Sequence, residues 1–249
     1  MKTAADFRST ARYNLAGKWK NAVLVGLIAS ILGAVDGAGL DVNVDIDAGN
    51  AKASLELAGQ TIFSTGGDLD SGIGAFLAGS AIYITIAAIA MGIAFFILGS
   101  VISVGYKKYN LKLTDKKEAG FDNLFAYFPY WKNVLKTKVL KTIYEILWTL
   151  LFIVPGIIAS FSYAMTDYIL AENPELTASE AIEKSKDMME GNRWRLFCLE
   201  ISFIGWELLS ILTLGIGNLW LTPYMEAARA AFYREVSGTE KQCFEEEWF

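Results

Sequence analysis

The chain has 249 residues, of which 53% are hydrophobic, and a formal net charge of −5. It is too apolar for an ordinary soluble domain, and no basic stripe with interleaved aromatic residues indicates nucleic-acid binding. With no histidine and two cysteines, Cys198 and Cys243, neither a disulfide framework nor a Cys/His zinc site is expected. No charged residue occurs between Asp70 and Lys107, which is room for a membrane span. The sequence therefore predicts an all-α membrane protein, with about six transmembrane or re-entrant helices in one domain, 1–249.

The N-terminal segment 1–17 is basic, and its apolar residues recur at helical spacing between Ala4 and Leu15. This pattern predicts an amphipathic helix on the membrane surface. The first span follows at about 18–35 and enters from the cytoplasm. A cleaved signal peptide is the competing interpretation, because a basic flank precedes a short apolar core. The length of the flank and the later spans favour a membrane span.

Segment 36–74 holds seven acidic residues and one lysine, Lys52. Polar and apolar residues alternate on both sides of Ala48-Gly49-Asn50, which predicts a β-hairpin with one polar face in an extracytoplasmic acidic loop. Asp41, Asn43 and Asp45 begin like a calcium loop. The pattern then fails, because Ile46 stands at the required glycine and Lys52 at the bidentate glutamate. A solvated acidic face is the favoured interpretation.

The second span is predicted at about 78–104, and a cytoplasmic basic segment, 107–133, follows it. Residues 107–141 hold nine lysines and three acidic residues. Aromatic residues between Phe121 and Trp131 form a mostly helical stripe that Pro129 interrupts. We expect an interfacial helix with aromatic anchors. A groove for a soluble partner is the alternative.

Segment 134–170 is read either as one span kinked at Pro155 or as a helical hairpin that turns at Pro155-Gly156. With a second hairpin over 194–236, turning at Gly215 to Gly217, 21 of the 22 lysines and arginines lie on the inner side. The kinked span would export four of them, so the positive-inside rule favours the hairpins and places both termini in the cytoplasm. The fourth span, about 156–170, is short enough to be re-entrant.

Segment 174–192 predicts a cytoplasmic amphipathic helix. Thr177 and Glu180 form a capping-box pattern at its start, and Gly191 suits its end. The two hairpins also share a spacing, since Tyr163 follows Gly156 by seven residues and Tyr224 follows Gly217 by seven. This pattern predicts parallel repeats, which are common in transporters.

Several short motifs resemble those of one family. They are Leu15-Ala16-Gly17-Lys18-Trp19, Leu147-Trp148, Ile153-Val154-Pro155-Gly156-Ile157-Ile158, Ser185-Lys186-Asp187-Met188-Met189-Glu190-Gly191, Leu196-Phe197, Ser202-Phe203-Ile204-Gly205-Trp206, Thr222-Pro223-Tyr224 and Phe232-Tyr233. Together they resemble the bacterial multi-pass membrane proteins of domain of unknown function 975, most specifically from Leu147 to Tyr233. The resemblance implies a bacterial plasma-membrane location and about six helices. The resemblance implies no activity and no site residues. The acidic loop, 36–74, does not match the motifs of the family.

Six ionisable residues fall within the proposed spans. They are Glu145, Asp167, Glu200, Glu207, Glu226 and Arg229. A charge in hydrocarbon costs about 2.5–3.5 kcal/mol, so these side chains should face protein or water. We expect Arg229 to pair with Glu200, Glu207 or both. A structural ion pair, a proton or substrate path and interfacial snorkelling all remain open.

No catalytic residue, metal site or cofactor is predicted. The expected protein is a non-enzymatic, multi-pass component of the bacterial plasma membrane with a transport-related role. The alternative is a non-catalytic scaffold, regulator or envelope-stress factor that acts through a partner. An intramembrane enzyme is the least supported class. The lipid bilayer is the expected partner, and a homo-oligomer or a membrane partner stays open.

Overall fold

The structure, a computed structural model, describes two compact parts of the chain. The described residues are 2–34, 40–47, 50–57, 60–68, 72–213 and 215–238, with side chains outside the description for 35–85, 88 and 89. One unit combines Met1–Ile28 with Val101–Phe249, and the other is Ala29–Ser100. The sequence, by contrast, predicts a single domain over 1–249.

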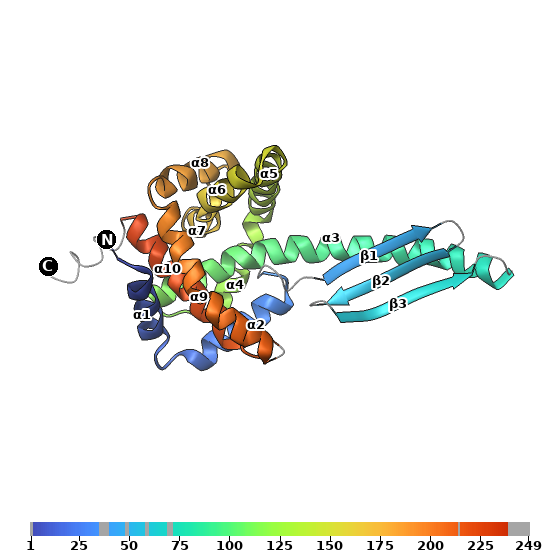
Figure 1. Ribbon diagram of the computed structural model, residues 1–249, viewed down its shortest axis with the longest axis horizontal. Helices are drawn as coiled ribbons and strands as arrows, with labels where there is room; N and C mark the ends of the chain where they lie inside the picture. The colour runs from blue at the N-terminus through green and yellow to red at the C-terminus, as the bar shows by residue number, and fades with distance from the viewer. Residues whose placement is uncertain are drawn as a thin grey trace. The chain divides into compact units, whose positions relative to one another are not determined.

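Helices make up most of the described chain (Figure 1). They are α1 (Ala4–Leu15), α2 (Trp19–Ile31), α3 (Gly72–Thr114), α4 (Asp122–Phe125), the 3-10 helix η1 (Phe128–Tyr130), α5 (Trp131–Leu151), α6 (Ile153–Tyr163), α7 (Thr166–Glu172), α8 (Ala178–Met189), α9 (Arg193–Leu212) and α10 (Asn218–Val236). The predominantly α-helical class predicted from the sequence is therefore observed.

The acidic loop forms a three-stranded antiparallel sheet in the order β1-β2-β3 (Figure 1). Strands β1 (Leu40–Asp47) and β2 (Asn50–Leu57) pair on either side of the predicted turn. A third strand, β3 (Gln60–Asp68), was not predicted and pairs with β2 across a bulge. The turn residues Ala48-Gly49 and the side chains of the proposed acidic face lie outside the described residues.

Helix α1 packs against α9 and α10 through its apolar stripe. Phe7, Ala11 and Leu15 are at most 1% exposed, and the ring centroids of Phe7 and Phe232 lie 5.3 Å apart. The expectation that this stripe faces the membrane surface is wrong, because neighbouring helices cover it.

The predicted second span is the middle of α3, which continues ten residues beyond position 104 to Thr114. Tyr106, Tyr109 and Leu111 in this extension are buried in the protein core. Gly105 allows the backbone at Leu124 to pass close to α3, since a Cβ on Gly105 would lie 2.4 Å from the carbonyl oxygen of Leu124.

The prediction of a single helix in 107–133 is wrong, and its position at the membrane interface stays a prediction. The chain instead forms α4, a turn, η1 and the start of α5, because Pro129 lies within η1 and interrupts the α-helix. Leu124 is fully buried, whereas Phe125 and Phe128 are exposed. The aromatic residues of the stripe, Phe121, Phe125, Phe128 and Trp131, are all exposed, although they lie on several short elements.

Helix α8 agrees with its prediction. The Thr177 hydroxyl accepts a hydrogen bond from the Glu180 N–H, and a Glu180 carboxylate oxygen accepts one from the Thr177 N–H. Gly191 has φ +75° beyond the end of the helix, a conformation that glycine adopts at little cost. The buried face of α8 includes Ala181 and Met189.

Candidate functional site

The segment 134–170 is a helical hairpin. Helix α5 ends at Leu151, Phe152 adopts an extended conformation, and α6 begins at the next residue. The ring centroids of Tyr144 and Tyr163 lie 6.2 Å apart, which brings the two arms side by side. A single kinked span would separate these residues by roughly 28 Å, given 1.5 Å per residue. The hairpin prediction is therefore confirmed.

The turn of this hairpin lies upstream of the predicted position. Phe152 makes the turn, and Pro155 falls in the first turn of α6, where its missing N–H is not needed. Gly156 is the point of closest approach, because a Cβ there would lie 2.8 Å from Cα of Thr149 and closer still to its hydroxyl.

The second hairpin has the same local construction. Gly215 has φ +83° in its turn. A Cβ on Gly217 would lie 3.0 Å from Cα of Ser210. In both hairpins a hydroxyl residue precedes the close-packed glycine by seven positions and stands two positions before the end of the first helix, α5 or α9. This shared geometry is consistent with the predicted repeat.

A buried cluster of charges surrounds Glu226 on α10. Lys107 Nζ of α3 lies 2.6 Å from Glu226 Oε2, and the Tyr168 hydroxyl of α7 donates a 3.1 Å hydrogen bond to the same oxygen. Arg229 Nη1 lies 3.0 Å from Glu226 Oε1, and Arg229 Nη2 lies 3.1 Å from Glu200 Oε1 of α9. These five residues are named the Glu226 cluster. It contains two acidic and two basic groups, so its formal charges balance.

A second balanced cluster lies near the end of α10. Arg234 binds Asp115 through two 2.7 Å contacts, Nε to Oδ1 and Nη2 to Oδ2. Arg234 Nη1 also bonds Glu172, which accepts a 2.6 Å hydrogen bond from the Tyr233 hydroxyl. Lys108 Nζ donates to the carbonyl of Ala171 nearby. The arrangement ties α3, α7 and α10 together.

Two predicted charges belong to other pairs. Asp167, 8% exposed, lies 3.4 Å from Lys138 of α5. Glu145 lies 4.0 Å from Lys141, which is the pairing expected from their spacing. The first contact joins α5 to α7, and the second joins successive turns of α5.

The predicted pairing of Arg229 with Glu200, Glu207 or both is confirmed for Glu200. Arg229 contacts Glu200 as expected, but its other partner is Glu226 and not Glu207. Glu207 is exposed near the tip of the second hairpin, and it makes no ion pair with any residue in the described ranges. Glu207 is therefore not a buried charge.

Five charged residues that form these ion pairs are not among the residues predicted from the sequence. They are Lys107, Lys138, Arg234, Asp115 and Glu172. Lys107 did carry a signal, because it is the first charge after the long uncharged stretch. The other four lie near predicted span ends, where a charge is ordinary.

Two polar contacts outside the proposed spans have shifted pKa values. The Tyr127 hydroxyl donates to the carbonyl of Ala171, and burial raises the pKa of Tyr127 to about 12. Hydrogen bonds from Thr177 lower the pKa of Glu180 at the start of α8. Both groups keep their usual charge at neutral pH. Their hydrogen bonds satisfy backbone groups at the end of α7 and at the start of α8.

A cavity of about 550 Å³ opens near the end of α3. It is lined by lysines, among them Lys18, Lys112 and Lys117, together with Glu118 and Asp122. Lys18 and Lys117 are exposed. The lining is mostly charged and polar, with Tyr109 as its aromatic residue.

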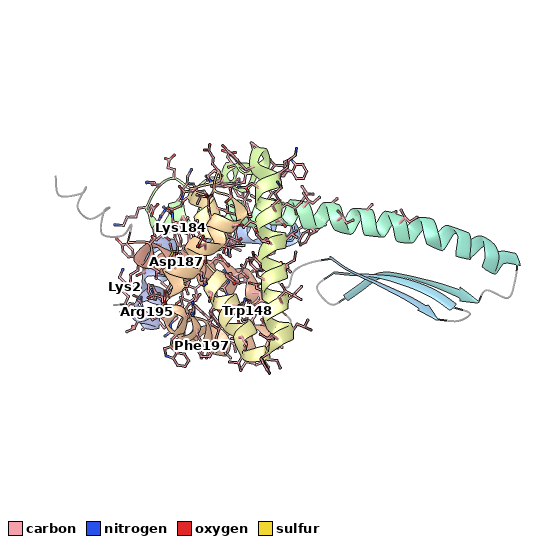
Figure 2. All side chains as sticks on the ribbon, turned by 90° about the horizontal axis from the view of Figure 1, so that it is seen from above. Lys2, Trp148, Lys184, Asp187, Arg195 and Phe197 are labelled. Carbon is pink, nitrogen blue, oxygen red and sulfur yellow. The ribbon has the colours of Figure 1, made fainter. Side chains whose placement is uncertain are left out.

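A smaller cavity, about 180 Å³, lies between the first hairpin and the junction of α8 with α9. Its lining combines apolar and basic side chains, and includes Trp148, Pro155, Ile158, Tyr163, Lys186 and Arg193. Figure 2 labels Trp148 on α5 and two residues of α8, Lys184 and Asp187.

The comparison with protein families gave one match, at residues 150–240, which cover the end of the first hairpin, α8 and the second hairpin. The family is described as Protein of unknown function (DUF975). Neither the curated proteins nor the solved structures gave a match to the chain. The match covers nearly the stretch, Leu147 to Tyr233, that carries the most specific motifs. Residues 150–240 are therefore similar to the DUF975 family of proteins of unknown function.

Proposed function

We propose that this protein is a multi-pass component of the bacterial plasma membrane, and that it acts as a non-catalytic scaffold for a membrane partner. The observation that carries the membrane assignment is the gathering of exposed large apolar side chains on the ends of both hairpins. They are Ile143, Tyr144, Ile146, Leu147, Trp148, Leu150, Leu151, Phe152, Ile153, Val154, Ile157 and Ile158 in the first, and Ile201, Ile204, Trp206, Leu208, Leu209, Ile211, Leu212, Ile216 and Trp220 in the second.

Such a surface is unfavourable in water. Leu150 is 82% exposed and Leu212 is 80% exposed, and contiguous apolar patches of this kind mark membrane or protein contacts. No charged residue occurs between Glu145 and Asp167, and Glu207 is the only one between Glu200 and Glu226. A hydrocarbon environment suits both hairpin ends.

The length and composition of several helices also support the membrane assignment. Within the described residues, Ala90–Thr114 and Ile153–Glu172 are long and apolar enough to cross a membrane, and Trp19–Ile31 is a shorter apolar helix. The proposed count of six transmembrane or re-entrant helices adds α2, α5, α9 and α10 to α3 and α6. Both termini are placed in the cytoplasm by the positive-inside distribution.

The charge clusters favour a scaffold over a transporter. In the Glu226 cluster each carboxylate meets a cation, and Glu226 also accepts a bond from a tyrosine hydroxyl. A path for ions or protons needs groups that can exchange partners, whereas these side chains connect α3, α7, α9 and α10 by direct contacts. We assign them a structural role.

Transport is the second candidate function. The shared seven-residue spacing of Thr149 with Gly156 and of Ser210 with Gly217 supports two equivalent hairpins. Repeated units of this kind are common in transporters. A saturable flux in liposomes that the Glu226→Gln variant abolishes, without loss of folding, would establish this role in place of the scaffold.

Topology is tested by cysteine labelling in intact cells. In a background with Cys198→Ser and Cys243→Ser, one variant carries Asn50→Cys in the acidic loop and the other Lys184→Cys on α8. A membrane-impermeant maleimide should label the first directly and the second only after the cells are permeabilised. Labelling of Lys184→Cys in intact cells would overturn the proposed topology, and extraction of the protein by alkaline carbonate would overturn membrane insertion.

The scaffold role is tested by native mass spectrometry of the protein released from its own membranes in lipid nanodiscs. A second polypeptide bound in fixed ratio is the expected result. The monomer alone, combined with saturable flux, would exclude the scaffold.

A further inference from the structure

The smaller cavity has a basic end that lacks acidic partners. Lys186 of α8 and Arg193, the first residue of α9, both line it. Neither makes an ion pair with any residue that the structure describes, although Asp187 and Glu190 are close in sequence. The two cations are therefore available to an anion, unlike Lys107 or Arg229, whose carboxylates are already in place.

The Arg193 side chain carries a second indication. Its Nε is buried and has no hydrogen-bond partner among the described residues. Leaving a buried donor unpaired is unfavourable, so such groups usually meet a ligand or a bound molecule. A guanidinium group fits phosphate oxygens well, because its N–H groups form a planar fork.

The rest of the cavity lining is mostly apolar, with hydroxyl groups from Ser162 and Tyr163. Trp148 is 41% exposed and Ile158 is 47% exposed, and both belong to the apolar end of the first hairpin. A small hydrophilic anion would leave this wall in contact with water. Two basic side chains at one end and an apolar wall beside them instead fit an amphiphile that carries a phosphate at one end.

The cavity volume limits how much of such a molecule is enclosed. At about 180 Å³ it is smaller than the roughly 300–1,000 Å³ of sites that enclose a whole small molecule. It can hold a headgroup phosphate and the beginning of a chain, and the remainder of the chain would follow the exposed side of α5 and α6.

We propose that this cavity binds the phosphate of an anionic phospholipid through Lys186 and Arg193, with an acyl chain along Trp148 and Ile158. The proposal rests on the membrane insertion proposed above. It assigns the lipid to the cytoplasmic leaflet, because α8 and the start of α9 lie on that side of the proposed topology.

The test uses the full chain in nanodiscs of phosphatidylcholine with a minor fraction of phosphatidylglycerol. Native mass spectrometry measures how many phosphatidylglycerol molecules stay bound as collision energy is raised. The wild type should retain one tightly bound molecule. Lys186→Gln and Arg193→Gln should each weaken retention about fivefold, from about 1 kcal/mol per basic residue near a lipid surface.

Lys184→Gln is the matched control, since it removes the same charge from the exposed side of the same helix and Lys184 does not line the cavity. It should leave retention unchanged. Equal losses in Lys184→Gln and Lys186→Gln would overturn the site in favour of a general charge effect. Retention of phosphatidylcholine as strong as that of phosphatidylglycerol would overturn the anionic specificity.

Three further outcomes separate the sources of failure. Competition by millimolar inorganic phosphate, with no preference for phosphatidylglycerol, would show a phosphate site and overturn the lipid proposal. Wild-type protein that does not enter nanodiscs at all would overturn membrane insertion. Protein that enters nanodiscs normally but gives equal retention for wild type and both variants would overturn only the lipid site.

Discussion

Gly156 and Thr149 face each other across the first hairpin so closely that a Cβ on the glycine would lie 2.8 Å from the threonine Cα. The arms therefore pack backbone to backbone at this point, and their separation is fixed by the absence of a side chain. Gly217 and Ser210 repeat the relationship in the second hairpin at 3.0 Å.

Gly156→Ala should separate α5 from α6. The added Cβ meets backbone and not a flexible side-chain end, so the free energy of unfolding should fall by about 1–3 kcal/mol. Thermal unfolding in detergent, followed by circular dichroism, measures the change. Gly205→Ala on α9 is the control, because a Cβ there meets nothing within 4 Å; a similar loss in both variants would contradict the close-approach explanation.

Glu226→Gln should destabilise the protein strongly. Removing one charge of a buried pair leaves Lys107 and Arg229 without their shared carboxylate, and such changes cost about 3–5 kcal/mol. Glu183→Gln is the matched control and should change stability by less than about 0.5 kcal/mol, because Glu183 is exposed on α8, outside the proposed spans. Adding Lys107→Met to Glu226→Gln should restore part of the stability; no recovery would argue against direct coupling of these two side chains.

Arg234→Lys should also be destabilising, despite keeping the charge. Arg234 contacts Asp115 with two nitrogens and Glu172 with a third, and a lysine cannot reproduce this fork. A loss of about 1–3 kcal/mol is expected from the unpaired buried acceptors. Arg12→Lys, at an exposed position on α1, should be neutral. Chemical denaturation of both variants measures the difference, and equal stability would show that the fork geometry is unimportant.

Thr177→Ala should loosen the start of α8. Loss of the capping hydroxyl costs about 0.5–2 kcal/mol in other helices. Hydrogen exchange of the first amides of α8 should become faster, with Ser179→Ala as the exposed control on the same turn. Unchanged exchange in Thr177→Ala would contradict a capping role.

The same cap predicts a pH dependence. Hydrogen bonds from Thr177 lower the pKa of Glu180 in the folded protein. The stabilisation that the ionised Glu180 gives the folded protein is therefore fully present above the unfolded pKa of about 4.3, and it is lost as pH falls through the lower folded pKa. Between neutral pH and about pH 3, protection of the α8 start should fall more in the wild type than in Glu180→Gln. Parallel pH profiles for the two proteins would exclude this linkage.

Local and charge-distribution patterns predicted the right elements. The capping box needed only Thr177 and Glu180 three positions apart, and the hairpin followed from where lysines and arginines fall along the chain. The turn position was wrong because Pro155 was treated as the turn itself, whereas proline fits the first turn of the new helix and Phe152 breaks the old one.

Contacts between distant elements were harder to foresee. Lys107 and Glu226 are paired only because α3 packs beside α10, which no local pattern reveals. The choice between Glu200 and Glu207 was more accessible. By helical rise Arg229 lies about 18 Å from the turn, closer to Glu200 at about 22 Å than to Glu207 at about 11 Å. Depth matching alone favours the observed partner.

Helices α6 and α7 together run from Ile153 to Glu172, which is 20 residues and about 30 Å, the hydrocarbon thickness of a bilayer. Helix α6 exposes apolar side chains such as Ile157, whereas Thr166 to Ala171 of α7 are buried. In the proposed orientation, lipid or a partner within the membrane can therefore contact this arm along α6 and not along α7. A partner that recognises the arm must bind near the hairpin turn.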